Sequence, residues 1–217
     1  IGYTQPSPEY IDKFSDVKDL VVYCARVSNP SNQLNTKTSD KLIKYLIDNK
    51  HWSPLEMASV TMEIETTRDI ARQLLRHRSF SFQEFSQRYQ TVDKLPISDV
   101  RECRLQDTKN RQNSIPTDDR DLRDWWANIQ QVAWEDAMLD YDMAIKKGVA
   151  KEQARALLPE GLTMSRMYMS GTMRSWIHYL KQRLDPSTQK EHREVAQEVL
   201  DILRPLAPVT MMAFFPY

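Results

Sequence analysis

The 217-residue chain has little glycine and cysteine, no net charge and no long apolar run. Four glycines provide no glycine-rich loop of the kind that binds dinucleotide phosphates, which excludes a Rossmann fingerprint. The two cysteines, Cys24 and Cys103, lie far apart and match no metal or redox spacing. This usage favours free thiols in a reducing compartment over a disulfide scaffold.

Charge and hydropathy narrow the class of protein further. Thirty basic residues balance thirty acidic ones, so no overall field draws the chain toward nucleic acid or a membrane surface. No apolar run reaches the roughly 20 residues that a membrane span needs, and residues 1–10 lack the apolar region of a signal peptide. We therefore expect a cytoplasmic protein whose anion binding, if any, is local.

A chain of this length with 41% hydrophobic residues is expected to form one domain, residues 1–217. The periodicity of its apolar residues predicts a helix-rich fold. We expect helices at residues 39–50, 66–78, 121–148, 151–159, 172–183 and 187–204, strands at 59–65 and 162–171, an irregular connection at 79–90, and a polar excursion at 94–120.

Local signals refine several of these elements. Ser39 or Asp40 is expected to cap the first helix, and Ser187 the last, which should end at Pro205. In the short helix before the arginines, the spacing predicts that Leu74 and Leu75 face inward.

The segment RHRSFSFQEFSQRY, residues 76–89, carries the strongest chemical signal. Between residues 72 and 88 the neutral chain gathers five Arg or His residues: Arg72, Arg76, His77, Arg78 and Arg88. A solvated basic face is the ordinary explanation for such a run. This segment, however, uses arginine and no lysine, and the planar guanidinium suits paired hydrogen bonds to phosphates and carbonyl edges.

Three other interpretations of the segment differ in how well the sequence supports them. Ser86 lacks the glycine-flanked turn of a serine nucleophile. The four histidines are scattered without the spacing of metal ligands, so we predict no metal site. A nucleic-acid module remains the main rival, because aromatic residues that could stack on bases alternate with the arginines. Those aromatic residues are Phe80, Phe82, Phe85 and Tyr89.

The pattern Arg-His-Arg, seven residues and Ser, at residues 76–78 and Ser86, resembles the signature of flavin-dependent thymidylate synthases. The resemblance continues in the same order through ARVS (25–28), HWSPLE (51–56), RQLLRHRSFSFQEFSQRY (72–89), ARALLP (154–159) and TMRSWIHYLKQR (172–183) followed by TQKEHREVA. These stretches cover most of residues 20–210.

The resemblance implies an α+β fold, helix-rich, with a mixed and mainly antiparallel sheet. It also implies a homotetramer whose active sites form at subunit interfaces and bind FAD, deoxyuridine monophosphate (dUMP), 5,10-methylenetetrahydrofolate and NADPH. The enzyme would methylate dUMP to thymidylate. A flavoprotein of this fold that only oxidises the nicotinamide cofactor is a further alternative.

The resemblance also implies residue roles. Contacts to the flavin would come from Ser53, Arg76, His77, Arg78, Glu84, Arg174 and His178. The nucleotide would be held by Gln73, Arg76, Glu84, Ser86, Gln87, Arg88, Arg155 and Arg183, with His51 near the flavin ring and the folate or nicotinamide. Arg183 is expected to act catalytically, because its charge would stabilise negative character on the uracil ring. The chain departs from the family pattern at Met57, Thr172 and His178.

Overall fold

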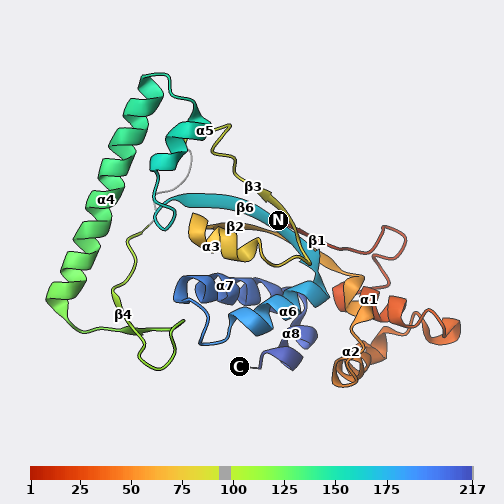
Figure 1. Cartoon of the computed structure of the whole chain (residues 1–217). Helices are drawn as coiled ribbons and strands as arrows, with labels where there is room; N and C mark the ends of the chain where they lie inside the picture. The colour runs from red at the N-terminus through yellow and green to blue at the C-terminus, as the bar shows by residue number, and fades with distance from the viewer. Residues whose placement is uncertain (93–98, 217) are drawn as a thin grey trace.

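The computed structural model describes residues 1–92 and 99–216, in which helices cover one face of an antiparallel sheet (Figure 1). The sheet has the strand order β1-β2-β6-β3, and all of its strand pairs are antiparallel. The α+β class is therefore confirmed. The elements in chain order are β1 (Gly2–Tyr3), α1 (Val17–Ala25), η1 (Pro30–Asn32), η2 (Thr36–Thr38), α2 (Ser39–Asp48), η3 (Ser53–Glu56), β2 (Ser59–Thr67), α3 (Arg68–Leu74), β3 (Ser81–Glu84), β4 (Arg104–Gln106), β5 (Ser114–Pro116), α4 (Arg120–Lys146), α5 (Lys151–Ala154), η5 (Arg155–Leu157), β6 (Met164–Thr172), α6 (Met173–Arg183), α7 (Lys190–Leu206) and α8 (Pro208–Phe214).

The long central pair of strands, β2 and β6, follows from alternating apolar residues. Met62 lies opposite Met169 and Ile64 opposite Met167, and all four side chains are buried on the face that meets the helices. The other face carries exposed polar residues, among them Glu65, which forms an ion pair with its neighbour across the strands, Arg166. The strand predicted at residues 59–65 is confirmed and extends to Thr67.

The core lies between this sheet and α6. Trp176, Ile177 and Leu180 are fully buried, as their spacing predicts, and the Trp176 indole donates a hydrogen bond of 3.1 Å to the Val60 carbonyl. The Phe80 ring meets Trp176 edge-on at 4.7 Å between centroids. Gly171 permits this packing, because a Cβ atom there would lie 2.4 Å from the Phe80 ring.

Several local expectations are corrected. The connection at residues 79–90 contains β3, which pairs with β6. Leu75 is 37% exposed because α3 ends one residue before it. The cap before α2 is Thr38, and the residue before α7 is Gln189, while the hydroxyl of Ser187 instead donates to Asp185 at 2.6 Å.

The C-terminal end also differs from the expectation. Pro205 lies inside the last turn of α7, and a further helix, α8, follows directly. The polar excursion at residues 94–120 contains the β4–β5 hairpin; its residues 94–98 lie outside the described part of the chain.

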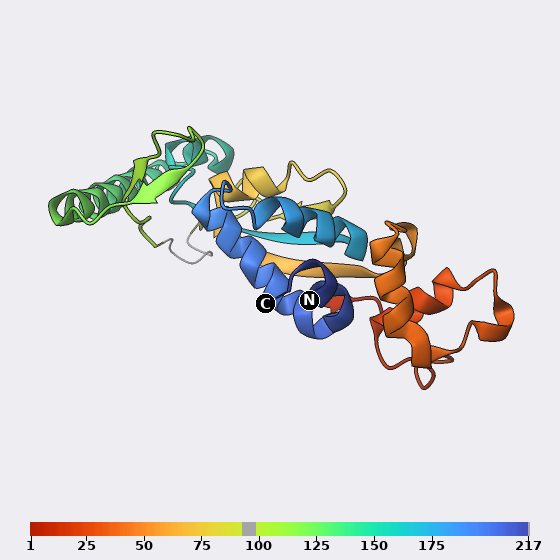
Figure 2. The ribbon, with the colours of Figure 1, turned by 90° about the horizontal axis from the view of Figure 1, so that it is seen from below.

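Helix α4 stands apart from the sheet, as Figures 1 and 2 show. It has 27 residues, of which only Gln130 and Tyr141 are buried. Its first turn is capped by Asp119, which accepts a hydrogen bond from the Leu122 amide at 3.0 Å, and its end is marked by Gly148 with a φ of +85°.

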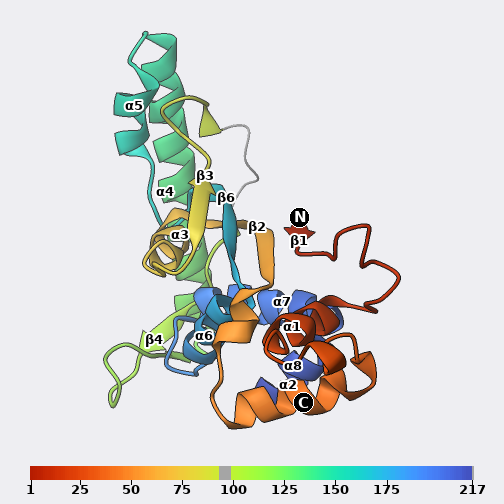
Figure 3. The ribbon, with the colours of Figure 1, turned by 90° about the vertical axis from the view of Figure 1, so that its right-hand side faces the viewer.

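The opposite end of the elongated molecule is formed by other helices. Figure 3, seen from that end, shows α1, α2 and α8 close together, with α4 and α5 farther away. Among the helices of residues 1–92 and 99–216, none has the length and apolar character needed to cross a bilayer.

Candidate active site

The turn between α3 and β3 places the Arg-His-Arg segment. The His77 amide donates to the Leu74 carbonyl at 3.0 Å, and the Phe80 amide donates to the His77 carbonyl at 3.2 Å, so the chain reverses tightly around His77. Arg76 and Arg78 are exposed on this turn, and within the described residues neither has an ion-pair partner. His77 is half-buried and points to α6.

Arg183, at the end of α6, donates from Nε to His77 Nε2 at 2.9 Å. Because Nε2 accepts this bond, the proton of the neutral imidazole lies on Nδ1. Burial, with the charges of Arg183 and Arg76, lowers the pKa of His77 to about 4. His77 is therefore neutral at physiological pH and holds the Arg183 guanidinium in a defined orientation.

Aromatic side chains of α6 and α7 lie next to His77. Tyr179 meets it edge-on at 5.0 Å between ring centroids, and His192 of α7 lies at 6.3 Å. His192 is fully buried, and burial together with the charge of Arg183 and with His77 lowers its pKa to about 3. Burial likewise raises the pKa of Tyr179. The interior beside Arg183 thus contains neutral imidazoles and a neutral phenol.

Gln73 of α3 joins this group through its side-chain amide. Its Nε2 donates to Gln189 Oε1 at 2.8 Å, and its Oε1 lies 3.1 Å from His192 Nδ1. The structure therefore brings together three of the expected site residues: Gln73, His77 and Arg183.

A second group lies at the end of β3 and beside α5. Glu84 accepts a hydrogen bond of 2.7 Å from Ser165 and lies 3.8 Å from Arg68. Beyond it, the exposed Arg88 approaches Glu152 of α5 at 3.9 Å.

The remaining members of this second group differ widely in exposure. Ser86 is exposed and Arg155 is half-buried. Gln87 is buried, and its Nε2 has no hydrogen-bond partner in the part of the chain that the structure describes.

A third group lies around η3 and the first half of α6. Arg174 forms an ion pair with Glu56, and the His178 ring lies 5.4 Å from that of Trp52. Burial, with the charges of Arg174 and Lys181, lowers the pKa of His178. Ser53 and His51 are exposed beside them.

The second and third groups lie at different ends of the sheet. Glu84 pairs with Met167, whereas η3 leads into Ser59, which pairs with Thr172. Five residues of strand separate these positions by about 16 Å, at roughly 3.3 Å per residue. Among the described residues, the expected ligands therefore form three groups on one chain, and the second and third groups lie toward opposite ends of β6.

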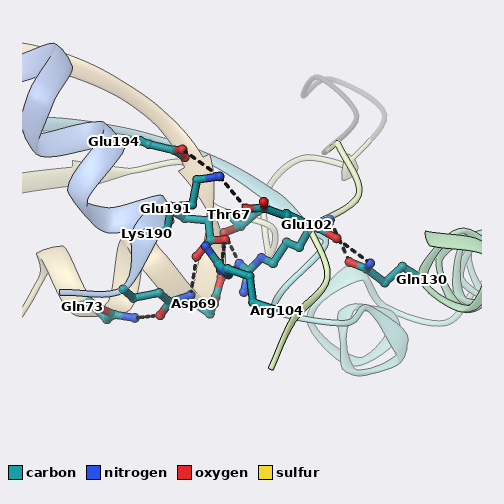
Figure 4. A network of polar contacts seen from close by, with 11 residues as sticks. Thr67, Asp69, Gln73, Glu102, Arg104, Gln130, Lys190, Glu191 and Glu194 are labelled. Atoms are coloured by element: carbon teal, nitrogen blue, oxygen red, sulfur yellow. Dashed lines mark hydrogen bonds and ion pairs between the residues drawn. The ribbon is translucent and has the colours of Figure 1, made fainter. Parts of the chain in front are cut away.

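A polar network next to Gln73 was missed by the sequence reasoning (Figure 4). Gln189 donates to Glu191 at 2.9 Å, and Glu191 forms an ion pair with Arg104 of β4. Arg101, just before β4, donates to Asp69 of α3 at 2.6 Å. No sequence signal could have found these contacts, since they join a polar segment to helices that lie far away along the chain.

Comparisons with known proteins agree with the geometry. Residues 9–209 match the family model described as "Thymidylate synthase complementing protein". A "Probable flavin-dependent thymidylate synthase" of Paramecium bursaria Chlorella virus 1 is 47% identical over 202 residues, which are 93% of this chain and 91% of that protein. The "Flavin-dependent thymidylate synthase" of Synechocystis is 50% identical over 177 residues, 82% of this chain and 80% of the relative.

The chain belongs to the flavin-dependent thymidylate synthase family. A solved structure has the same fold as this member of the family. The "UMP/dUMP methylase PolB from Streptomyces cacaoi bound with 5-Br dUMP" superposes with a TM-score of 0.82 at 26% identity, covering 100% of this chain and 93% of that one.

Proposed function

We propose that the protein is a flavin-dependent thymidylate synthase. It methylates dUMP to thymidylate, with 5,10-methylenetetrahydrofolate as the carbon donor, and with FAD and NADPH as the source of hydride. The observation that carries the proposal is the hydrogen bond between neutral His77 and the charged Arg183 guanidinium at the Arg-His-Arg turn, in a chain that is 47% identical to a named relative over almost its whole length. A nucleic-acid module would not need this half-buried pair.

The exposed residues of the turn fit the phosphates of FAD. Arg76 and Arg78 have no carboxylate partner among the described residues, so both guanidinium groups are available for charge-assisted hydrogen bonds. Ser53, Glu84, Arg174 and His178 would complete the contacts to the cofactor. The bound flavin would supply the hydride, and the protein would bind, orient and shield the reactants.

The arginines near β3 and α6 would hold the nucleotide. Arg88 and Arg155 would bind its phosphate dianion, with Ser86 and Gln87 as hydrogen-bonding partners. Arg183 would face the uracil edge, where its charge would stabilise negative character on the ring during methyl transfer. Its hydrogen bond to His77 fixes the guanidinium before the substrate arrives, which reduces the reorganisation needed in the reaction.

Active sites at the interfaces of a homotetramer are part of the proposal. The separation of the expected ligands into three groups supports this assembly, because a second chain could bring one group against another. A surface stripe on α4 gives further support. This α4 stripe consists of Trp125, Ile129, Val132, Leu139 and Met143, which share one side of the helix at spacings of three, four and seven residues and are all exposed.

The proposal extends to the domain organisation and the cellular location of the protein. We propose that residues 1–217 act as one domain of this family and that the protein works in the cytoplasm. His51, exposed beside η3, would lie near the flavin ring and the folate or nicotinamide.

The purified protein tests the proposal directly. It should be yellow and should form thymidylate only when dUMP, methylenetetrahydrofolate, FAD and NADPH are all present. UMP is tested in the same assay as a second candidate substrate, because the solved structure with this fold is that of a UMP/dUMP methylase. NADPH oxidation without any nucleotide methylation would instead identify an oxidase, and salt-sensitive oligonucleotide binding would favour the nucleic-acid module.

Two variants separate the proposed roles. Arg183→Ala should keep the flavin absorbance but remove most turnover, because the partner of Arg183 is the uracil ring. Arg78→Ala should lose flavin affinity. Loss of flavin from Arg183→Ala with full flavin retention in Arg78→Ala would reverse the two assignments.

A further inference from the structure

The side-chain amide of Gln73 is held by a chain of hydrogen bonds that ends on a carboxylate. Gln73 Nε2 donates to Gln189 Oε1 at 2.8 Å, and Gln189 Nε2 donates to Glu191 Oε2 at 2.9 Å. The other oxygen of Glu191 accepts from Arg104 on β4. Figure 4 shows this path running from α3 across the start of α7 to β4.

The carboxylate gives the chain of hydrogen bonds a single direction. An ionised carboxylate only accepts, so Gln189 must turn its NH₂ group to Glu191 and its oxygen to Gln73. Gln73 must then turn its own NH₂ group to Gln189 and its oxygen to His192, 3.1 Å away. His192 Nδ1 therefore carries the proton and donates to Gln73.

Glu191 is suited to this task. Burial favours its neutral form, but hydrogen bonds from its own backbone amide and Gln189, and the charge of Arg104, keep its pKa below the ordinary value. His192 is fully buried and neutral, and its Nε2 has no partner among the described residues. The single proton of its imidazole can therefore lie on Nδ1, which donates to Gln73.

We propose that Glu191 and Gln189 are positioning residues, which fix the Gln73 amide in one of its two flipped orientations and thereby set how it meets the nucleotide. One N–H and one lone pair of Gln73 are used by the chain of hydrogen bonds, and the other N–H and lone pair are left for the substrate. The inference rests on the proposed function, in which Gln73 contacts dUMP. It adds two residues that reach the nucleotide only through Gln73.

The test measures dUMP binding to the purified holoenzyme by titration calorimetry. Glu191→Gln can either donate or accept, so the direction of the chain is lost, and Gln189→Leu interrupts it while leaving Arg104 and Glu191 paired. Each variant should raise the dUMP dissociation constant by about fivefold to tenfold, roughly the contribution of one hydrogen bond. The effect should appear in the KM for dUMP, whereas kcat should change by less than about twofold. Glu194→Gln, an exposed position on the same helix, is the matched control and should bind dUMP as the wild type does.

A double-mutant cycle separates positioning from a general structural role. If Glu191 acts through Gln73, then Glu191→Gln should have no further effect on dUMP binding once Gln73 is replaced by Ala. Additive losses, or losses that follow the melting temperature, would overturn the inference, and so would wild-type affinity in both Glu191→Gln and Gln189→Leu. Absence of dUMP binding in the wild type would instead overturn the proposed function itself.

Discussion

The helical layer beneath the sheet buries Trp176, Ile177 and Leu180 completely, whereas α4 buries only two of its 27 residues. Both regions carry large apolar side chains, but those of α4 lie on the surface, with Trp125 at 55% and Leu139 at 62% exposure. A single chain thus buries the apolar side chains of the layer around His77, and it leaves the α4 stripe exposed to solvent. The difference fits the proposed assembly, in which contacts between subunits would cover the α4 stripe.

The largest expected effect is on the buried layer. Trp176→Ala removes an indole that packs on Phe80 and donates to the Val60 carbonyl, so it should lower the free energy of unfolding by about 3–5 kcal/mol. Denaturant titration followed by circular dichroism measures this. Ile202→Ala, half exposed on α7, is the control and should change stability by no more than about 0.5 kcal/mol. Equal losses in the two variants would mean that the sheet–α6 core is not the main source of stability.

The α4 stripe is tested by Leu139→Glu. A charge placed on a buried subunit contact should weaken the assembly by about 2 kcal/mol or more, roughly a thirtyfold rise in its dissociation constant. Light scattering on a sizing column measures the mass. Gln131→Ala, on another side of α4, should assemble normally. A wild-type mass for Leu139→Glu at low micromolar concentration would place the subunit contact elsewhere.

The buried imidazoles predict a pH dependence that belongs to the helical layer alone. The pKa of His192 is about 3 in the folded chain and near 6.5 when unfolded, so between these values the unfolded chain binds more protons. Stability should therefore fall as the pH is lowered from 6.5 towards 3. From pH 7 to pH 4.5, the wild type should lose roughly 2 kcal/mol more than His192→Gln, as measured by urea titration at each pH. Parallel pH profiles for the two proteins would contradict this origin.

The sequence was sufficient for the elements whose periodicity is local. The alternation of Val60, Met62 and Ile64 predicted β2, and the spacing of Trp176 and Leu180 predicted the buried side of α6. It was insufficient for β3, because Ser79–Gln90 has no local period and β3 exists only through its pairing with β6. Pairing partners that are distant along the chain leave no mark in a single sequence.

The candidate site shows the same division. The arginines and His77 could be predicted because their residue types and motif spacing are visible in the sequence. Their grouping could not, since the contact of His77 with Arg183 spans 106 residues. Glu191 and Gln189 could not be predicted for the same reason, since Gln189 contacts Gln73 across 116 residues. In the sequence, Glu191 resembles any other acidic residue on a helix.

The smallest expected effect concerns the ion pair between Arg88 and Glu152 of α5, which packs against α4. Arg88 and Glu152 lie 3.9 Å apart, with side chains that are 69% and 54% exposed, so the pair should contribute less than about 0.5 kcal/mol to stability. Glu152→Gln should therefore leave the melting temperature unchanged, and it should not weaken dUMP binding, because Arg88 loses only a competing carboxylate. Arg88→Ala, with the same ion pair removed from the other side, should weaken dUMP binding by roughly tenfold. Calorimetry on both variants makes the comparison, and equal losses of dUMP affinity would show that Glu152 is needed to orient Arg88.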